Sequence, residues 1–167
     1  MRIRPGQRCD FAAINRAELS AGTLFEGTHM AWAVGDSTPA TVLDEGVEND
    51  SLWVAEADGM VAGFLLVEEI GRDLHLREVA VSREFQGRGF GRALVETALA
   101  EAARRGLAAV TLTTDRTLSW NAPWYAKLGF AILSGSDIPR RLARQLATEP
   151  ERHQRCAMRR ATAIRSA

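Results

Sequence analysis

The stretch that decides the fold reads LHLREVAVSREFQGRGFGRALVETALAEAARR and occupies residues 74–105. It predicts an apolar strand, then a glycine-rich turn at Gln86–Gly91, then a long amphipathic helix. A turn of this kind presents several free backbone N–H groups at the positive end of a helix dipole, which suits phosphate oxygens. Glycine also lets the main chain approach an anion without a Cβ in the way. The residue types therefore predict a site for a phosphorylated cofactor.

The spacing of the glycines restricts which cofactor the turn could hold. A dinucleotide fingerprint needs a third glycine where this chain has Arg92, and a Walker loop needs a Gly-Lys pair, whereas the only lysine is Lys127. The pattern Gln-x-x-Gly-x-Gly after a strand resembles the acyl-CoA pyrophosphate loop of the GNAT superfamily of N-acetyltransferases. The alternative is a plain glycine-rich connection between a strand and a helix, with no ligand.

A second block, NAPWYAKLGF at residues 121–130, carries the same resemblance. It resembles the C-terminal GNAT motif, in which a tyrosine followed closely by Leu-Gly-Phe lies at the sulfur of the cofactor. The two blocks occur in the family's order, with a predicted helix and strand between them. The chain is therefore similar to GNAT N-acetyltransferases in layout from Arg2 to Arg160, with about thirty residues matching specifically.

The resemblance implies a fold of the α/β (α+β) class and a single N-acetyltransferase domain over residues 1–167. It implies a three-layer sandwich with a mixed, largely antiparallel central sheet, helices on both faces, and acyl-CoA in the cleft between two splayed parallel strands. The residues themselves predict strands at 2–4, 52–57, 60–68, 74–81, 109–113, 130–133 and 155–158. They predict helices at 9–24, 39–45, 89–105, 122–128 and 140–147.

Local signals support several of these boundaries. Asp58-Gly59 separates two apolar runs by two residues, which favours a type I′ hairpin. Thr38 is the expected cap of the second helix and Gly46 its expected stop. Because a helix connects the strands before and after the glycine-rich turn, these two strands are expected to be parallel neighbours.

The resemblance implies acetyl-CoA as acyl donor and no metal. It places the cofactor contacts on the strand, the loop and the second block, at Val79, Ala80, Val81, Gln86, Gly87, Arg88, Gly89, Phe90, Gly91, Arg92, Asn121 and Tyr125. In this set Gln86 orders the loop, and Asn121 hydrogen-bonds the arm of the cofactor. Many members have the asparagine further than four residues from the tyrosine, so Asn121 departs from the common pattern.

Acyl transfer from a thioester to an amine needs a base for the amine and an acid for the departing thiolate. The family motif places Tyr125, the only tyrosine, at the sulfur, and a phenol with a pKa of about 10 can protonate a thiolate. The alternative role of Tyr125 is to pack between helix and sheet.

Glu78 is the candidate base, and His75 is the second choice. Strict alternation points them to opposite faces, and proton removal by water is the third possibility. The resemblance implies a backbone N–H near Val79 as oxyanion donor.

Composition excludes several classes of function. The chain has 46% apolar and 25% charged residues with a formal net charge of zero, so no overall field favours nucleic acid or an anionic membrane. No secretory signal is visible, and the longest strongly apolar run, Met60–Val67, is too short to span a bilayer. Cys9 and Cys156 form no CxxC pair, which predicts buried or half-buried free thiols in a reducing cytoplasm.

Two charged segments could each be either a binding surface or ordinary solvated surface. Residues 31–58 hold seven acids and no base, which could form a wall attracting a cationic amine or a solvated helix face. Residues 139–167 hold eight arginines, and surface charge is favoured there over nucleic-acid binding. The favoured function is acetyl transfer to a primary amine of a small molecule. A protein or peptide acceptor and a non-catalytic acyl-CoA sensor are the alternatives, and a homodimer is raised because dimers are frequent among similar proteins.

Overall fold

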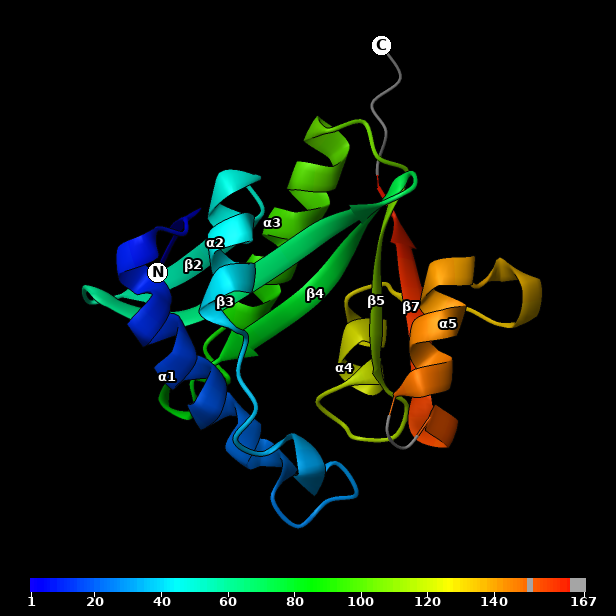
Figure 1. Ribbon diagram of the computed structural model, residues 1–167, viewed down its shortest axis with the longest axis horizontal. Coiled ribbons are helices and arrows are strands. Elements are labelled where there is room, and N and C mark those ends of the chain that lie inside the picture. The colour runs from blue at the N-terminus through cyan, green and yellow to red at the C-terminus, as the bar shows by residue number, and fades with distance from the viewer. Residues whose placement is uncertain (150–151, 163–167) are drawn as a thin grey trace. The chain divides into compact units, whose positions relative to one another are not determined.

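The structure is a computed structural model that describes residues 1–149 and 152–162. The described chain forms two compact units (Figure 1). Unit 1 consists of Met1–Glu68 and Arg77–Ala98, and unit 2 of Glu69–Leu76 and Leu99–Ala167. A single N-acetyltransferase domain over residues 1–167 stays a prediction.

Within the described residues, seven strands are hydrogen-bonded in the order β1-β2-β3-β4-β5-β7-β6. The strands are β1 (Arg2–Pro5), β2 (Leu52–Ala57), β3 (Met60–Ile70), β4 (Asp73–Val81), β5 (Ala109–Asp115), β6 (Ala131–Ile132) and β7 (Arg155–Ala161). The α-helices are α1 (Phe11–Gly22), α2 (Ala40–Glu48), α3 (Phe90–Arg104), α4 (Ala122–Lys127) and α5 (Arg140–Thr148). The pair β4–β5 is parallel, and β1–β2, β2–β3, β5–β7 and β6–β7 are antiparallel. The predicted mixed, largely antiparallel sheet is therefore confirmed.

Unit 1 contains the predicted hairpin between β2 and β3. Asp58 and Gly59 have φ angles of 51° and 78°, and positive φ at both central residues is what a type I′ turn requires. The β2–β3 register is regular from Leu52↔Leu66 to Ala55↔Gly63 and shifts after Ala55. The hairpin signal in the sequence was therefore sufficient to predict both strands.

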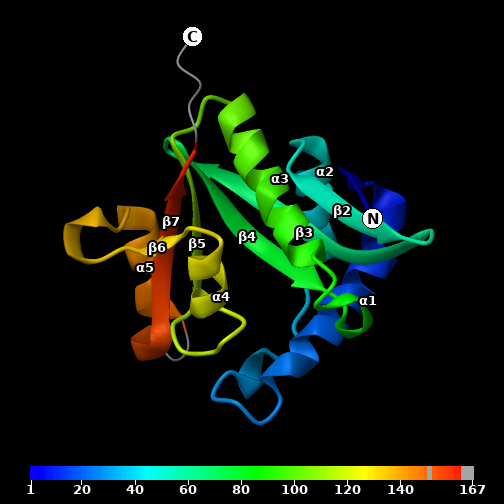
Figure 2. The ribbon, with the colours of Figure 1, turned by 180° about the vertical axis from the view of Figure 1, so that it is seen from behind.

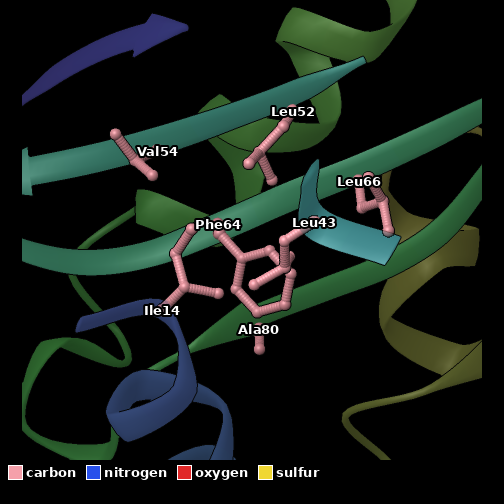
Figure 3. Packing of buried hydrophobic residues seen from close by; sticks show 7 residues of the cluster. All are labelled: Ile14, Leu43, Leu52, Val54, Phe64, Leu66 and Ala80. Carbon is pink, nitrogen blue, oxygen red and sulfur yellow. The ribbon is translucent and has the colours of Figure 1, made fainter. Parts of the chain in front are cut away.

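The core of unit 1 lies between the sheet and the first two helices. Helices α1 and α2 cover one face of β2 and β3, and the first part of α3 covers the other face (Figures 1 and 2). The buried apolar cluster beneath α1 and α2 consists of Ile14, Leu43, Leu52, Val54, Phe64, Leu66 and Ala80 (Figure 3). Because Ala80 belongs to this cluster, the C-terminal end of β4 is anchored in the core of unit 1.

The predicted boundaries of the second helix are wrong at both signals. Helix α2 continues through Gly46 to Glu48, and Gly46 is buried, with its ideal Cβ position only 2.6 Å from Leu66 Cδ1. This glycine provides room for close packing and does not end the helix. Thr38 does not cap the helix either, because its backbone N–H and its hydroxyl both donate to the Glu18 carboxylate, at 2.7 and 2.8 Å.

Unit 2 is built on β5 and β7. The start of β4 pairs with β5 from Asp73↔Ala109 to Leu76↔Leu112, and β5 pairs with β7 along its whole length. Helices α4 and α5 lie on opposite faces of these strands (Figures 1 and 2). Arg159 of β7 binds the Asp73 carboxylate through two hydrogen bonds, of 3.0 and 3.1 Å. The parallel neighbours predicted from the helix between them are confirmed.

Candidate functional site

The C-terminal end of β4 carries the predicted strand contacts Val79, Ala80 and Val81. Their positions in β4 lie beyond residues 73–76, which form the parallel register with β5. Ala80 is buried, whereas Val79 and Val81 are half-buried. The strand ends at Val81, and the N–H of the next residue, Ser82, donates to the Ala62 carbonyl at 2.9 Å. The main chain of this segment is therefore fixed on its β3 side.

The glycine-rich loop is closed at its two ends by buried phenylalanines. Phe85 and Phe90 are both buried, and their rings meet edge to face with centroids 5.7 Å apart. Between them, Gln86 Nε2 donates to the Val81 carbonyl at 2.9 Å. This hydrogen bond ties the loop to the end of β4.

The glycines of the loop have conformations and surroundings suited to an anion. Gly87 and Gly89 have φ angles of 74° and 86°, which favour glycine, and a Cβ at either position would meet no atom within 4 Å. Ala93 N–H donates to Gly89 O at 3.0 Å, and helix α3 begins at Phe90. The N–H groups of residues 90–92 therefore precede the first intrahelical hydrogen bond. Such a turn, open on its outer side, fits a phosphate group.

Two exposed arginines flank these N–H groups. The Arg88 guanidinium carbon lies 5.5 Å from the centroid of the Phe85 ring, and Arg92 is 3.7 Å from the Glu96 carboxylate. Gly91, between them, lies within the first turn of α3 and is half-buried. Positive charge thus accompanies the helix N-terminus, which favours an anionic ligand.

The Leu-Gly-Phe part of the second block ends helix α4 in a Schellman motif. Phe130 N–H donates to Tyr125 O at 3.2 Å, and Gly129 N–H donates to Ala126 O at 2.9 Å. Gly129 has a φ of 83°, which explains the glycine. The Tyr125 and Phe130 rings meet edge to face at 5.7 Å, the apolar contact that accompanies this motif. The spacing from Tyr125 to Phe130 is therefore a helix-ending signal as well as a family pattern.

Asn121 starts the same helix through its main chain. Its carbonyl accepts from Trp124 N–H at 2.9 Å and from Tyr125 N–H at 3.0 Å, and its side chain makes no cap hydrogen bond. The loop before it is held by the buried Asp115 carboxylate, which accepts from the N–H groups of Thr117 and Leu118, both at 2.7 Å. Asp115 was missed in the sequence, although an aspartate two residues before a threonine at a strand end is a turn signal.

Arg160 is a second residue that the sequence did not single out. Its Nη1 donates to the Leu128 carbonyl at 2.6 Å, and its Nε lies 3.4 Å from the ideal Cβ position of Gly129. It thus stabilises the turn that ends α4, at Leu128, three residues after Tyr125. No sequence signal relates β7 to this turn.

The two candidate bases differ in their surroundings. His75 is only 2% exposed, and its Nδ1 lies 3.1 Å from the hydroxyl of Thr111, its partner in the β4–β5 register. Glu78, three positions further along β4, is half-buried. Neither role in proton transfer is tested by this arrangement, and both stay predictions.

Helix α1 contacts two segments near its C-terminal end. The half-buried Glu18 carboxylate holds Thr38, and burial raises the pKa of Glu18. Ser20 Oγ accepts from Arg83 N–H at 3.1 Å and from Ser82 Oγ at 3.2 Å. The sequence did not predict these contacts because each joins residues 20 or more positions apart.

Part of the acidic segment is engaged in ion pairs. Arg8 binds Asp44 at 2.5 Å and Glu48 at 3.1 Å, and Arg4 binds Glu56 at 2.6 Å. These contacts neutralise three of the seven acids of residues 31–58. The interpretation of this segment as solvated and paired surface charge is thereby favoured over a purely acidic wall.

The cysteines are both free thiols: Cys156 is buried, but Cys9 is exposed, so the prediction that both are at least half-buried is wrong for Cys9. Burial raises the pKa of the Cys156 thiol. In residues 1–149 and 152–162, no group of three His, Cys, Asp or Glu side chains is placed to hold a metal ion. Over the same part of the chain, none of the helices has the length and apolar character needed to cross a bilayer.

Comparison with known proteins identifies a similar sequence and similar folds. The chain is 34% identical over 84 residues to N-acetyltransferase family 8 member 3 of Rattus norvegicus, a match that covers 47% of this chain and 37% of that protein. The fold is similar to the PaiA N-acetyltransferase of Thermoplasma acidophilum in complex with coenzyme A, with a TM-score of 0.75, 15% identity and coverage of 96% and 98% of the two chains.

It is also similar to the ribosomal-protein-S18-alanine N-acetyltransferase of Escherichia coli, with a TM-score of 0.68, 20% identity and coverage of 99% and 95%. The family profile of the acetyltransferase (GNAT) domain matches residues 48–132, just over half of the 167 residues. The matched region contains the whole glycine-rich loop and the whole second block. The chain therefore belongs to the GNAT acetyltransferase domain family.

Proposed function

We propose that this chain transfers the acetyl group of acetyl-CoA directly to a primary amine of a small molecule. The observation that carries the proposal is the loop Gln86–Arg92, where two glycines with positive φ face open space at the N-terminus of a 15-residue helix. This arrangement suits the diphosphate of coenzyme A. Family membership and the coenzyme A complex of the similar Thermoplasma acidophilum protein support the same donor.

Cofactor binding uses main-chain groups more than side chains in this proposal. The N–H groups of Gly87 through Arg92 bind the diphosphate, and Gln86 keeps the loop joined to Val81. The main chain of Val79, Ala80 and Val81 hydrogen-bonds the pantetheine arm. Asn121 donates to the same arm with its side-chain amide, which is not used in capping helix α4.

Acetyl transfer forms a bond between the amine nitrogen and the acetyl carbon and breaks the bond between that carbon and sulfur. The departing thiolate needs a proton, which we assign to the hydroxyl of Tyr125. The Schellman motif and the Phe130 ring hold the Tyr125 backbone and ring in a fixed orientation. A fixed acid loses less entropy in the transition state than a mobile one.

The attacking amine must lose a proton, and we assign this step to Glu78, directly or through water. The burial of His75 and its contact with Thr111 favour a structural role for His75. Glu78 is half-buried, so its carboxylate can exchange a proton with solvent. An N–H group near Val79 is the proposed donor to the oxyanion.

The acceptor is the least constrained part of the proposal. The connection between α1 and α2 contains the aromatic residues Phe25 and Trp32. These residues and the remaining acids of residues 31–58 are consistent with a small cationic amine. A protein N-terminus is the second candidate, because the chain shares its fold with the Escherichia coli enzyme named for alanine of ribosomal protein S18. A cytoplasmic location and a homodimer stay predictions of the sequence.

The first experiment measures binding and turnover separately. Acetyl-CoA is expected to raise the midpoint of thermal unfolding, whereas NAD and ATP are not. Release of free coenzyme A is then followed with amino acids, polyamines, aminoglycosides and peptides as acceptors. Turnover with peptides alone would favour the second candidate. Binding without turnover on any acceptor would favour a sensor, and stabilisation by NAD alone would exclude the loop assignment.

The second experiment tests the assigned residues. Tyr125→Phe is expected to keep the affinity for acetyl-CoA and to lower kcat, because only the hydroxyl is removed. Glu78→Gln is expected to remove or shift the acidic limb of the pH–rate profile. Glu84→Gln serves as the control, because Glu84 is exposed and, like Glu78, precedes the glycine-rich loop in the sequence. An unchanged kcat in Tyr125→Phe, or an unchanged pH profile in Glu78→Gln, would contradict the respective role.

A further inference from the structure

Gly63 lies in the interior of β3, at a point where another main chain comes unusually close. Its ideal Cβ position is 2.4 Å from the Ala80 carbonyl oxygen and 3.1 Å from Val81 Cα, both in β4. These are backbone atoms, so no rotation of a side chain can make room for a methyl group. The φ of Gly63 is not positive. Glycine is therefore required here for space and not for conformation.

The strand is irregular beside this glycine. In the β2–β3 register, Ala55 is opposite Gly63 and Glu56 is opposite Val61, so Ala62 is the extra residue of a bulge. The Ala62 carbonyl accepts from the N–H of Ser82, the residue that follows β4. The bulge and the glycine together determine where the end of β4 runs.

The segment that approaches Gly63 is the one that the proposed function assigns to cofactor binding. Ala80 and Val81 belong to the expected strand contacts, and the Val81 carbonyl also accepts from Gln86 of the loop. We propose that Gly63 is a positioning residue for coenzyme A binding, because the absence of its Cβ lets the main chain of Ala80 and Val81 take its observed path. This inference rests on the proposed function and names a residue on a neighbouring strand that has no predicted contact with the cofactor.

Gly46 offers a matched control in the same unit. Its ideal Cβ position is 2.6 Å from Leu66 Cδ1 and 3.3 Å from Leu52 Cβ, so an added methyl group there also meets neighbours closer than van der Waals distance. The nearer neighbour is the end of a flexible side chain, which can rotate, and Leu52 Cβ needs to move by only a few tenths of an ångström. Gly46→Ala therefore adds the same atom to the core of unit 1 without displacing β4.

The test compares wild type, Gly63→Ala and Gly46→Ala by calorimetric titration with coenzyme A, together with the urea midpoint of each protein. Gly63→Ala is expected to bind coenzyme A at least tenfold more weakly, and Gly46→Ala within twofold of wild type. Hydrogen exchange gives a second readout that needs no ligand. Amides of residues 79–86 are expected to exchange faster in Gly63→Ala, whereas those of the β2–β3 hairpin keep their wild-type rates.

The outcomes separate this inference from the proposed function. If wild type does not bind coenzyme A, the proposed function fails first, and the inference fails with it. If wild type and Gly63→Ala bind equally, the inference is overturned while the proposed function stands. Affinity losses in both variants that follow their losses of stability would overturn it too. Failure of Gly63→Ala to fold would also overturn it, because the residue would then serve the whole unit and not the path of one strand.

Discussion

Two glycines of unit 2 end helices with the same geometry, and they allow a matched test of how the Tyr125 helix is held. Gly129 follows α4 and Gly106 follows α3, with φ angles of 83° and 68°. Both lie in Schellman motifs, since Leu107 N–H donates to Ala102 O at 2.8 Å as Phe130 N–H donates to Tyr125 O. Replacing either glycine by alanine is expected to cost about 1–2 kcal/mol from the left-handed conformation alone.

The surroundings of the two glycines add no clash. A Cβ at Gly106 meets no atom within 4 Å, and a Cβ at Gly129 would lie 3.4 Å from Arg160 Nε and 3.7 Å from its Cζ, which are ordinary van der Waals distances. We therefore expect a loss of about 1–2 kcal/mol for Gly129→Ala and for Gly106→Ala. Arg160→Met removes the donor of the 2.6 Å hydrogen bond to Leu128 O, and a bond from a charged donor contributes about 1.5–3 kcal/mol.

Urea unfolding at pH 7 measures these losses of stability. The midpoint temperature of thermal unfolding should fall by roughly 2–4 °C for each kcal/mol lost in a chain of this size. Because Gly129 ends the helix that carries Tyr125, kcat is expected to fall in Gly129→Ala and to stay near wild type in Gly106→Ala. A loss below about 0.5 kcal/mol in Arg160→Met would refute the role given to Arg160. A loss below about 0.5 kcal/mol in both glycine variants would refute the conformational reasoning.

Two further substitutions test other contacts. Hydrogen bonds from Arg104, which is 68% exposed, and from a second arginine lower the pKa of Glu101 from 4.5 to about 2. This stabilisation is present above pH 4.5 and is lost as the pH falls toward 2, so Glu101→Gln should lose about 1–2 kcal/mol at pH 7 and almost nothing near pH 2. A loss that does not change with pH would contradict the assignment, and Glu96→Gln is the control. Ser20→Ala removes the acceptor of the N–H of Arg83, which lies between the end of β4 and the glycine-rich loop. Because the loop is then held less firmly, KM for acetyl-CoA should rise several-fold with kcat little changed. An unaltered KM would argue against a role of this hydrogen bond in cofactor binding.

The strands and helix α3 could be predicted because their signals are local. Alternating apolar residues on both sides of Asp58-Gly59 specify the hairpin. The glycines of the loop and the apolar face of α3 specify the turn and the helix after it. In each case the residues that decide the structure lie within one turn or one strand of each other.

Signals that depend on distant partners could not be interpreted correctly. Gly46 resembles a glycine that ends a helix, but Leu66 packs so closely against it that a larger residue would clash. Thr38 has the appearance of a cap, but Glu18 takes both of its hydrogen-bond donors. The conformation of a glycine or threonine in isolation does not contain this information.

The candidate site shows the same division. The loop and the second block could be located because each is a short contiguous motif. Arg160, which holds the end of the second block, could not be predicted, since a guanidinium gives no indication of which carbonyl it will bind. Asp115 binds N–H groups only two and three residues further on, so its turn could have been predicted from the sequence. Gly63 could have been noted as a glycine inside a strand, but the strand that approaches it is not evident from sequence.

The different exposure of the two cysteines has a practical consequence for spectroscopy. Cys9 lies on the surface in a short helical turn, whereas Cys156 is buried with a raised pKa. A maleimide dye should therefore couple at a single position, and its fluorescence could report ligand binding without any engineered site. The same reactivity gives a background of about one equivalent per chain when a chromogenic disulfide reagent detects released coenzyme A. A Cys9→Ser variant would remove that background.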